Sequence, residues 1–111
     1  MSGAQRFSMI GAAGSDATAV LVGAGDIGSC ETVGPQATAE LLDGIRGTVF
    51  LAGDNAYPSG SAADYRDCFN PTWGRHRSRM RPVPGNHEYE TPGASAYFDY
   101  FGAGAGPRGL G

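Results

Sequence analysis

Lysine is missing from this chain of 111 residues, so its eight basic side chains are all arginine. With a net charge of −3, the sequence does not provide the broad basic surface that binds nucleic acid nonspecifically. Long apolar runs are missing too. No stretch approaches the ~20 residues that a membrane-spanning helix needs. Residues 1–16 also lack the apolar core of a signal peptide. We therefore expect no nucleic-acid surface and no membrane span.

Cysteine is scarce, with Cys30 and Cys68 the only two in the sequence. Neither belongs to a Cys-x-x-Cys motif, which excludes zinc-ribbon and thioredoxin-type sites. The two can form one disulfide or remain as buried thiols, and the sequence leaves both alternatives open.

The composition is that of one folded domain, with 41% apolar and 17% charged residues. Residues 1–18 are predicted to be a flexible N-terminal lead, and residues 19–111 to form the domain. The apolar pattern predicts strands at 19–24, 48–52 and 81–84, and helices at 35–45, 62–69 and 72–80. This β-α-β-α-β order indicates an α/β fold with a mostly parallel sheet. We expect the aromatic residues after Tyr89 to pack as a loop against that sheet.

Three short motifs follow the predicted strands: Gly-Asp-Ile-Gly at 25–28, Gly-Asp-Asn-Ala-Tyr at 53–57 and Gly-Asn-His-Glu at 85–88. Their polar residues are 28 and 32 positions apart, close to the ~30 residues of one strand–helix–strand unit. A parallel sheet with this repeat brings the carboxyl ends of its strands to one edge. The spacing therefore predicts a metal site at that edge, formed by Asp26, Asp54 and Asn86.

Residues 23–28 also match the dinucleotide fingerprint G-x-G-x-x-G, with Glu40 or Asp43 as the acid that would bind a ribose. That mechanism requires a helix to begin within the glycine turn, so that its N-terminus faces the pyrophosphate. Here the helix cannot begin before Pro35, because a polar segment of six residues intervenes. We therefore favour the metal site over a Rossmann-type module.

Taken in order and at this spacing, the three motifs closely resemble the calcineurin-like metallophosphoesterase superfamily, and in particular its bacterial branch similar to purple acid phosphatases. The family pattern is Gly-Asp-x-Gly, Gly-Asp-x-x-Tyr, Gly-Asn-His-Glu, Val-x-x-His and Gly-His-x-His. The first three blocks match this chain. The resemblance implies that the chain forms the β-α-β-α-β half of a two-sheet sandwich whose second half is absent.

The resemblance also implies a dinuclear metal site. Asp26 and Tyr57 would bind one ion, Asp54 would bridge both ions, and Asn86 would bind the second. A tyrosinate ligand suits Fe(III) at the first position, with Fe, Zn or Mn at the second. Gly28 stands where the wider superfamily has a histidine, which agrees with Tyr57 taking that coordination place.

By the same resemblance the chain belongs to a hydrolase, an acid phosphatase-like enzyme in which a metal-bound hydroxide attacks a phosphate ester. His87 would contact the phosphate or protonate the leaving oxygen as a general acid. We expect Glu88 to orient His87.

The last two blocks of the family pattern supply three histidines, and this chain has none after His87. We therefore expect a truncated fragment, inactive alone, with the missing C-terminal half as a candidate partner. A non-catalytic binding or scaffold protein remains the alternative. Relatives are often secreted or periplasmic, so the compartment stays open.

One basic cluster lies outside the three motifs: Arg75, His76, Arg77, Arg79 and Arg81. We interpret it as the solvated face of a short helix, with His76 at the surface. A contact with a phosphate or its leaving group is the alternative.

Overall fold

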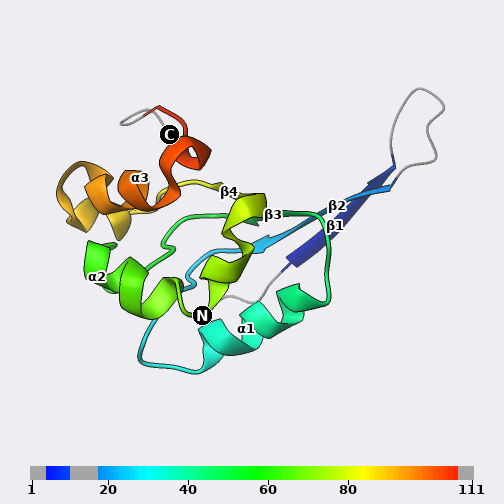
Figure 1. Cartoon of the computed structure of the whole chain (residues 1–111), viewed down its shortest axis with the longest axis horizontal. Coiled ribbons are helices and arrows are strands. Elements are labelled where there is room, and N and C mark those ends of the chain that lie inside the picture. Colours follow the sequence, from blue (N-terminus) through cyan, green and yellow to red (C-terminus); the bar gives the residue numbers. More distant parts are fainter. Residues whose placement is uncertain (1–4, 11–17, 108–111) are drawn as a thin grey trace.

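Three parallel strands and one antiparallel strand form the sheet of this α/β domain (Figure 1). The structure is a computed structural model, and it describes residues 5–10 and 18–107. The spatial order is β1-β2-β3-β4, and β2, β3 and β4 run parallel. Their bounds are β1 (Gln5–Ile10), β2 (Thr18–Ala24), β3 (Thr48–Leu51) and β4 (Met80–Pro82). The predicted α/β class and mostly parallel sheet are confirmed.

Strand β1 corrects the expectation of a flexible lead over residues 1–18. It pairs antiparallel with β2, from Gln5 opposite Gly23 to Ile10 opposite Thr18. Within this segment, Arg6 to Met9 (Arg-Phe-Ser-Met) alternate polar and apolar residues, which is the period of a strand. The remainder of the predicted lead, residues 1–4 and 11–17, lies outside the described residues. The domain boundary at residue 19 stays a prediction.

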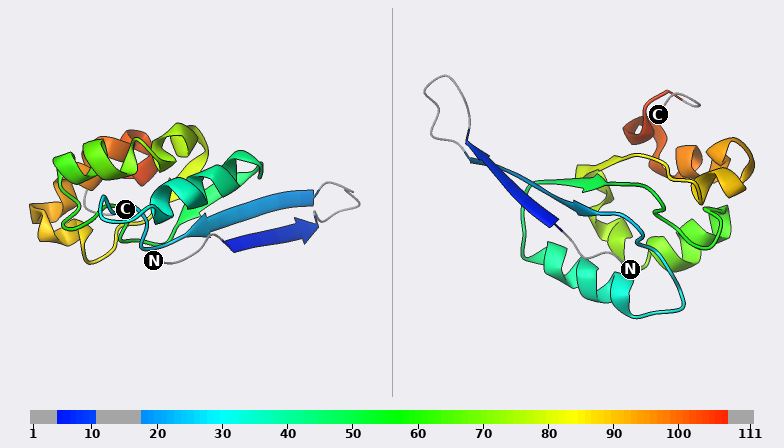
Figure 2. Two further views of the ribbon diagram at one scale, coloured as in Figure 1. Left: turned by 90° about the horizontal axis from the view of Figure 1, so that it is seen from below. Right: turned by 180° about the vertical axis from the view of Figure 1, so that it is seen from behind.

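Helices α1 (Gly34–Asp43) and α3 (Ser95–Phe101) lie on the same face of the sheet as the helical segment between β3 and β4 (Figure 2). That segment consists of α2 (Ala62–Asp64), the π-helical turn η1 (Tyr65–Phe69) and the 3₁₀ helix η2 (Trp73–Arg79). In the described part of the chain, no helix has the length and apolar character that crossing a bilayer requires.

Helix α1 begins one residue before Pro35, whose missing N–H is tolerated in a first helical turn. Its buried face is formed by Pro35, Thr38, Ala39 and Leu42. The predicted position of this helix is correct to within two residues, although Leu41, one of its apolar residues, is 59% exposed.

The core between the sheet and the helices centres on Trp73, which is fully buried. Its indole N–H donates a hydrogen bond to Thr38 Oγ1 at 2.9 Å, which joins η2 to α1. Val22, Val49 and Met80 supply the sheet side of this core, one from each parallel strand. The helices are therefore fixed on one face of the sheet.

The aromatic tail forms helix α3, so the prediction of a loop is wrong there. Tyr97, Phe98 and Phe101 are buried in the core, and Tyr97 and Phe101 lie one helical turn apart. The glycines of the tail lowered the apparent helical tendency, but none lies inside the helix, and Gly93 and Gly102, which flank it, both have positive φ.

Candidate metal centre

The first two motifs run side by side beyond the ends of β2 and β3. They continue the parallel pairing of these strands as far as an isolated bridge between Gly28 and Ala56. Three backbone hydrogen bonds join them: Asp26 N–H to Gly53 O (3.2 Å), Ile27 N–H to Asp54 O (3.1 Å) and Gly28 N–H to Asn55 O (2.8 Å). Hydrogen bonds between their backbones therefore hold the first two motifs together at one edge of the sheet, as the sequence predicted.

Asp26 and Asp54 occupy the same unusual backbone conformation, with φ of 55° and 53°. The left-handed region is costly for most side chains, and aspartate is among the residues that tolerate it best. The two carboxylates line one hollow of about 370 Å³ together with Asn86. Three of the four predicted metal ligands therefore lie together at the carboxyl edge of the sheet.

The third motif packs directly against the second. A Cβ at Gly85 would overlap both the backbone nitrogen and the Oδ1 atom of Asp54, so only glycine allows this approach. Two residues later, His87 N–H donates a hydrogen bond to Asp54 Oδ1 at 2.9 Å. The carboxylate of Asp54 is thus oriented by the backbone of the third motif.

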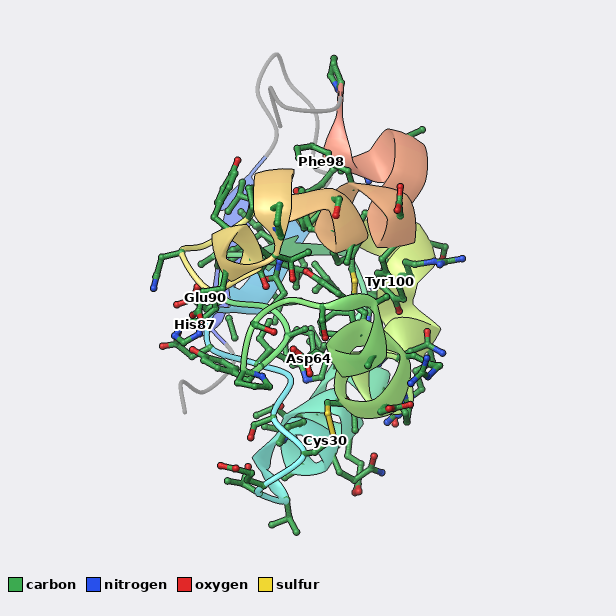
Figure 3. The ribbon with its side chains drawn as sticks, turned by 90° about the vertical axis from the view of Figure 1, so that its left-hand side faces the viewer. Cys30, Asp64, His87, Glu90, Phe98 and Tyr100 are labelled. Atoms are coloured by element: carbon green, nitrogen blue, oxygen red, sulfur yellow. A yellow bond between two sulfur atoms is a disulfide. The ribbon has the colours of Figure 1, made fainter. Side chains whose placement is uncertain are left out.

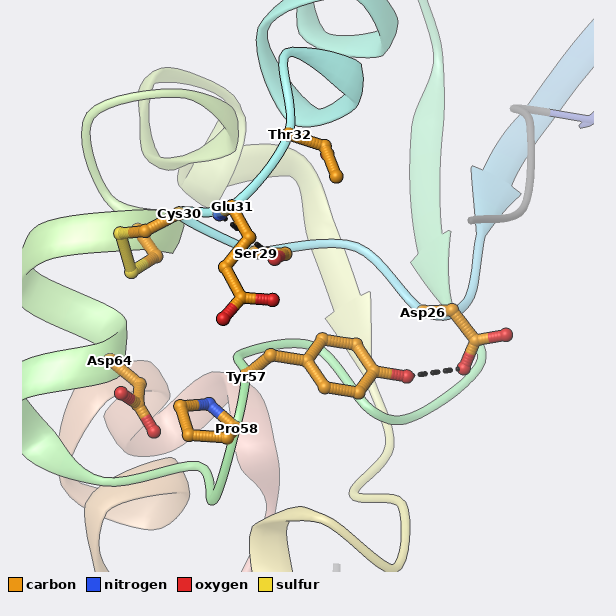
Figure 4. A pocket seen from close by; sticks show the side chains of 9 residues that line it. Asp26, Ser29, Cys30, Glu31, Thr32, Tyr57, Pro58 and Asp64 are labelled. Carbon is orange, nitrogen blue, oxygen red and sulfur yellow. Dashed lines mark hydrogen bonds between the residues drawn. A yellow bond between two sulfur atoms is a disulfide. The ribbon is translucent and has the colours of Figure 1, made fainter.

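Tyr57, the fourth predicted ligand, is not part of the lining of this hollow, but it contacts Asp26. Its hydroxyl donates a hydrogen bond to Asp26 Oδ1 at 2.8 Å (Figure 4). Burial raises the pKa of Tyr57 above its ordinary value, and the bond to the Asp26 carboxylate raises it further. The phenol is therefore protonated in the metal-free protein, and only a strong Lewis acid would remove its proton.

Gly28 has no room for a side chain. A Cβ there would lie 2.7 Å from Asn55 O and 3.1 Å from Phe69 Cβ. A histidine at this position would displace the second motif, which agrees with the assignment of the coordination place to Tyr57.

His87 lies beside Tyr57, with the two ring centroids 4.6 Å apart. Its Nδ1 atom is 2.6 Å from Pro58 O and 2.9 Å from a carboxylate oxygen of Glu90, whose position beside His87 is visible in Figure 3. Both neighbours are acceptors, so Nδ1 carries a proton and Nε2 is the atom left to exchange one. The Pro58 carbonyl raises the pKa of His87, with the charges of Asp54 and Glu90 adding to this effect.

Glu88 does not contact His87 in the way that the sequence predicted. Its side chain is fully buried and accepts hydrogen bonds from three backbone N–H groups. These are Gly85 N–H (2.8 Å), Asn55 N–H (3.0 Å) and Ala56 N–H (3.2 Å). Burial raises the pKa of Glu88, and the three N–H groups oppose that rise. Glu88 therefore fastens the third motif to the second, and Glu90 takes the place beside His87.

Sequence reasoning missed the role of Glu90, although its position gave a signal. Glu90 lies three residues after His87, the spacing at which two side chains meet on one side of a helical turn.

The donors brought together here are two carboxylates, an amide and a phenol. All are hard oxygen ligands, which suits Fe(III) or Mn more than a soft thiophilic metal. Among the residues that the structure describes, no group of three or more His, Cys, Asp or Glu side chains is arranged to hold a metal. Asp26 and Asp54 are the only members of the predicted set that belong to those four residue types.

Cys30 and Cys68 form a disulfide with their Cα atoms 4.9 Å apart, which decides between the two alternatives left open by the sequence. The bond ties the loop after the first motif to η1. Both cysteines line a second cavity of about 590 Å³, which extends to Asp26 and Tyr57 (Figure 4).

The basic cluster lies away from this edge, and its members have different roles. Arg75 pairs with Asp43 at 2.8 Å, and Arg77 stacks over the ring of Tyr100. His76 is 8% exposed and lies 3.0 Å from Asp43, so its predicted surface position is wrong. The helical periodicity could not reveal that η2 packs its histidine against α1.

Comparison with protein-family models, with curated proteins and with solved structures gave no match for this chain. The dinucleotide interpretation gains no support from the fold, because α1 begins six residues after Gly28. Gly28 itself bridges to Ala56 instead of opening a helix.

Proposed function

We propose that this chain supplies part of the dinuclear metal centre of a phosphoesterase, an enzyme that hydrolyses phosphate esters. The observation that carries the proposal is the hollow shared by Asp26, Asp54 and Asn86, with Tyr57 hydrogen-bonded to Asp26 at its border. We further propose that the domain is the N-terminal half of a calcineurin-like sandwich. The parallel strand order and the three motif positions support that assignment.

The roles follow from the chemistry of each side chain. Asp26 and Tyr57 would hold one ion and Asn86 the other, while Asp54 would contact both. When bound, a metal pair supplies an activated water and Lewis-acid stabilisation of the phosphoryl oxygens. Fe(III) with Fe, Zn or Mn is the proposed pair, because a phenolate and carboxylates favour a hard, strongly acidic first ion.

His87 would act on the substrate and not on the metals. Its Nδ1–H is held by Pro58 O and by the Glu90 carboxylate, which directs exchange to Nε2. A protonated imidazole at that position can donate to the leaving oxygen of the ester. The carboxylate of Glu90 stabilises the cationic form that this step requires.

Four oxygen donors are few for two ions. We therefore propose that this chain alone binds the second ion weakly and turns over no substrate, and that further ligands complete the centre. A C-terminal half carrying histidines is the partner that the family resemblance implies.

The test compares the purified chain with Asp54→Asn after loading with Fe(III) and then Zn(II). We expect the unaltered chain to bind Fe(III) stoichiometrically and Asp54→Asn to weaken the binding of both ions. Asp67→Asn is the matched control, because it removes the same charge at an exposed position paired with Arg66. Equal metal binding by all three proteins would overturn the proposal.

An assay with an aryl phosphate and the same metals tests the expectation of inactivity. Turnover that Asp54→Asn abolishes would overturn that expectation while supporting the metal centre. Ligand binding that needs no metal would favour a scaffold role, and protection from proteolysis by NAD without metal would favour a dinucleotide site.

A further inference from the structure

A third cavity, with a polar lining, lies at the opposite edge of the sheet from the three motifs. It has a volume of about 520 Å³. Its lining includes three arginines and two hydroxyl side chains: Arg46, Arg79, Arg81, Thr48 and Ser78. Thr48 is the first residue of β3, and Arg79 directly precedes β4. The cavity therefore lies at the amino ends of the parallel strands, whereas Asp26, Asp54 and Asn86 lie beyond their carboxyl ends.

Arg79 has a fixed position in the wall of this cavity. Its guanidinium donates to Gly47 O at 2.8 Å and to Leu42 O at 2.9 Å, and it lies 3.1 Å from His76 Nδ1. These acceptors are two carbonyls and a ring nitrogen, and none carries a negative charge. They occupy three of the five guanidinium N–H groups. The positive charge is therefore held in place, and two N–H groups remain to donate to a ligand.

The three arginines lack carboxylate partners among the described residues. The ion pairs found there join Arg66 to Asp67 and Arg75 to Asp43, and two more involve histidine. No Asp or Glu belongs to the lining of the cavity. Three cations at one cavity repel one another, and an anion bound between them would remove that cost.

The chemistry of the lining specifies what kind of anion fits. A guanidinium presents parallel N–H donors that match the oxygens of a phosphoryl group, and the hydroxyls of Thr48 and Ser78 add neutral donors. The positive charge of this lining contrasts with that of the whole chain, which carries a net charge of −3. The positive charge of this cavity is thus a local property.

We propose that this cavity is a binding site for a compact oxyanion, either inorganic phosphate or the phosphoryl group of a small molecule. The site is distinct from the proposed metal centre and does not depend on it. It also gives a place to the phosphate contact that the sequence raised as an alternative for the basic cluster, but at the edge of the sheet away from the motifs.

The test is a titration of the uniformly ¹⁵N-labelled chain with sodium phosphate, followed by NMR. EDTA is present throughout, so that no metal links phosphate to the other edge. Sodium chloride at matched ionic strength is the reference. We expect saturable shifts of the backbone amides of Gly47, Thr48 and Ser78.

The informative variant is Arg46→Gln combined with Arg81→Gln, because both residues are exposed and Arg79 is kept in its structural role. Arg66→Gln combined with Arg77→Gln removes the same two charges elsewhere. We expect the first double variant to weaken phosphate binding at least tenfold and the second to change it less than twofold. The amide spectrum of each variant shows directly whether it is folded.

A second arm uses glycerol 3-phosphate. Tighter binding than that of inorganic phosphate would assign the site to a phosphoryl group on a small molecule, and weaker binding would assign it to the free anion. Non-saturable shifts, shifts confined to the amides around Asp26 and Asn86, or equal loss of binding in both double variants would overturn the proposal.

Discussion

Tyr57 and Asp26 are 31 positions apart in the sequence, yet the Tyr57 hydroxyl donates a hydrogen bond to Asp26 Oδ1 at 2.8 Å. The parallel pairing of the first two motifs produces this contact, since Gly28 and Ala56 bridge one residue before Tyr57. A metal ion bound by both side chains would replace the shared proton. In the proposed metal centre, coordination by both side chains would therefore take the place of this hydrogen bond.

Replacement of Tyr57 by phenylalanine tests that relationship. An Fe(III)–tyrosinate complex absorbs visible light, so the chain loaded with Fe(III) is expected to be coloured and Tyr57→Phe colourless. Loss of the hydrogen bond is expected to cost about 1 kcal/mol of the free energy of unfolding in the metal-free protein. Absorption spectra and urea unfolding measure the two effects. Tyr89→Phe is the control, since Tyr89 is 53% exposed, and a visible band that survives in Tyr57→Phe would contradict the assignment.

The pKa of His87 is expected to lie above its ordinary value of 6.5 in the metal-free protein, because of Pro58 O and the charges of Asp54 and Glu90. A raised folded-state pKa means that this contribution to stability is complete below pH 6.5 and is lost as the pH rises through the folded-state value. An NMR titration of the imidazole resonances in EDTA measures the midpoint. Glu90→Gln should lower it, whereas Glu31→Gln should not; a midpoint at or below 6.5 in the unaltered chain would show that the contacts do not act in solution.

Gly85→Ala should disrupt the centre without removing any predicted ligand. The new Cβ would overlap the Asp54 carboxylate and backbone nitrogen, so these atoms must move. Overpacking of this kind costs about 1–3 kcal/mol. Metal titration and urea unfolding are the measurements, and Gly104→Ala is the control because a Cβ there meets nothing within 4 Å. Equal metal affinity in both variants would refute the role given to this approach.

Reduction of the disulfide should lower the thermal midpoint. Cys30 and Cys68 are 38 positions apart, and closing a loop of that length stabilises a fold by about 4 kcal/mol in the chain-entropy account. For a domain of this size the loss corresponds to roughly 15–30 °C. Circular dichroism with and without a reductant measures it. The variant with serine at both positions should have the thermal midpoint of the reduced protein, and the reductant should not change it. An unchanged midpoint on reduction of the unaltered chain would disprove the stabilising role.

The sequence predicted the three parallel strands and their alternation with helices along the chain, because each strand is a short apolar run with a motif after it. The edge shared by Asp26, Asp54 and Asn86 follows from that order alone. Strand β1 was missed because glycine and alanine around it suggested a flexible segment. Helix α3 was missed for a similar reason, since its flanking glycines concealed the aromatic positions inside it.

Interactions between distant segments could not be predicted from the sequence. Nothing local to Glu88 shows that its carboxylate lies under Asn55 and Ala56, 33 and 32 positions away. His76 likewise resembles its arginine neighbours until η2 is packed against α1. In both cases burial, which depends on the tertiary arrangement, decides what the side chain does.

The hydrogen bonds of Glu88 affect how this site could be transplanted into another protein. Copying the four proposed ligands would reproduce their identities but not their mutual placement, because Glu88, which is not among them, joins the second and third motifs. A graft onto a different parallel sheet would have to carry Glu88 and the backbone amides it accepts from. The smallest unit that could be transplanted is therefore larger than the set of proposed metal ligands.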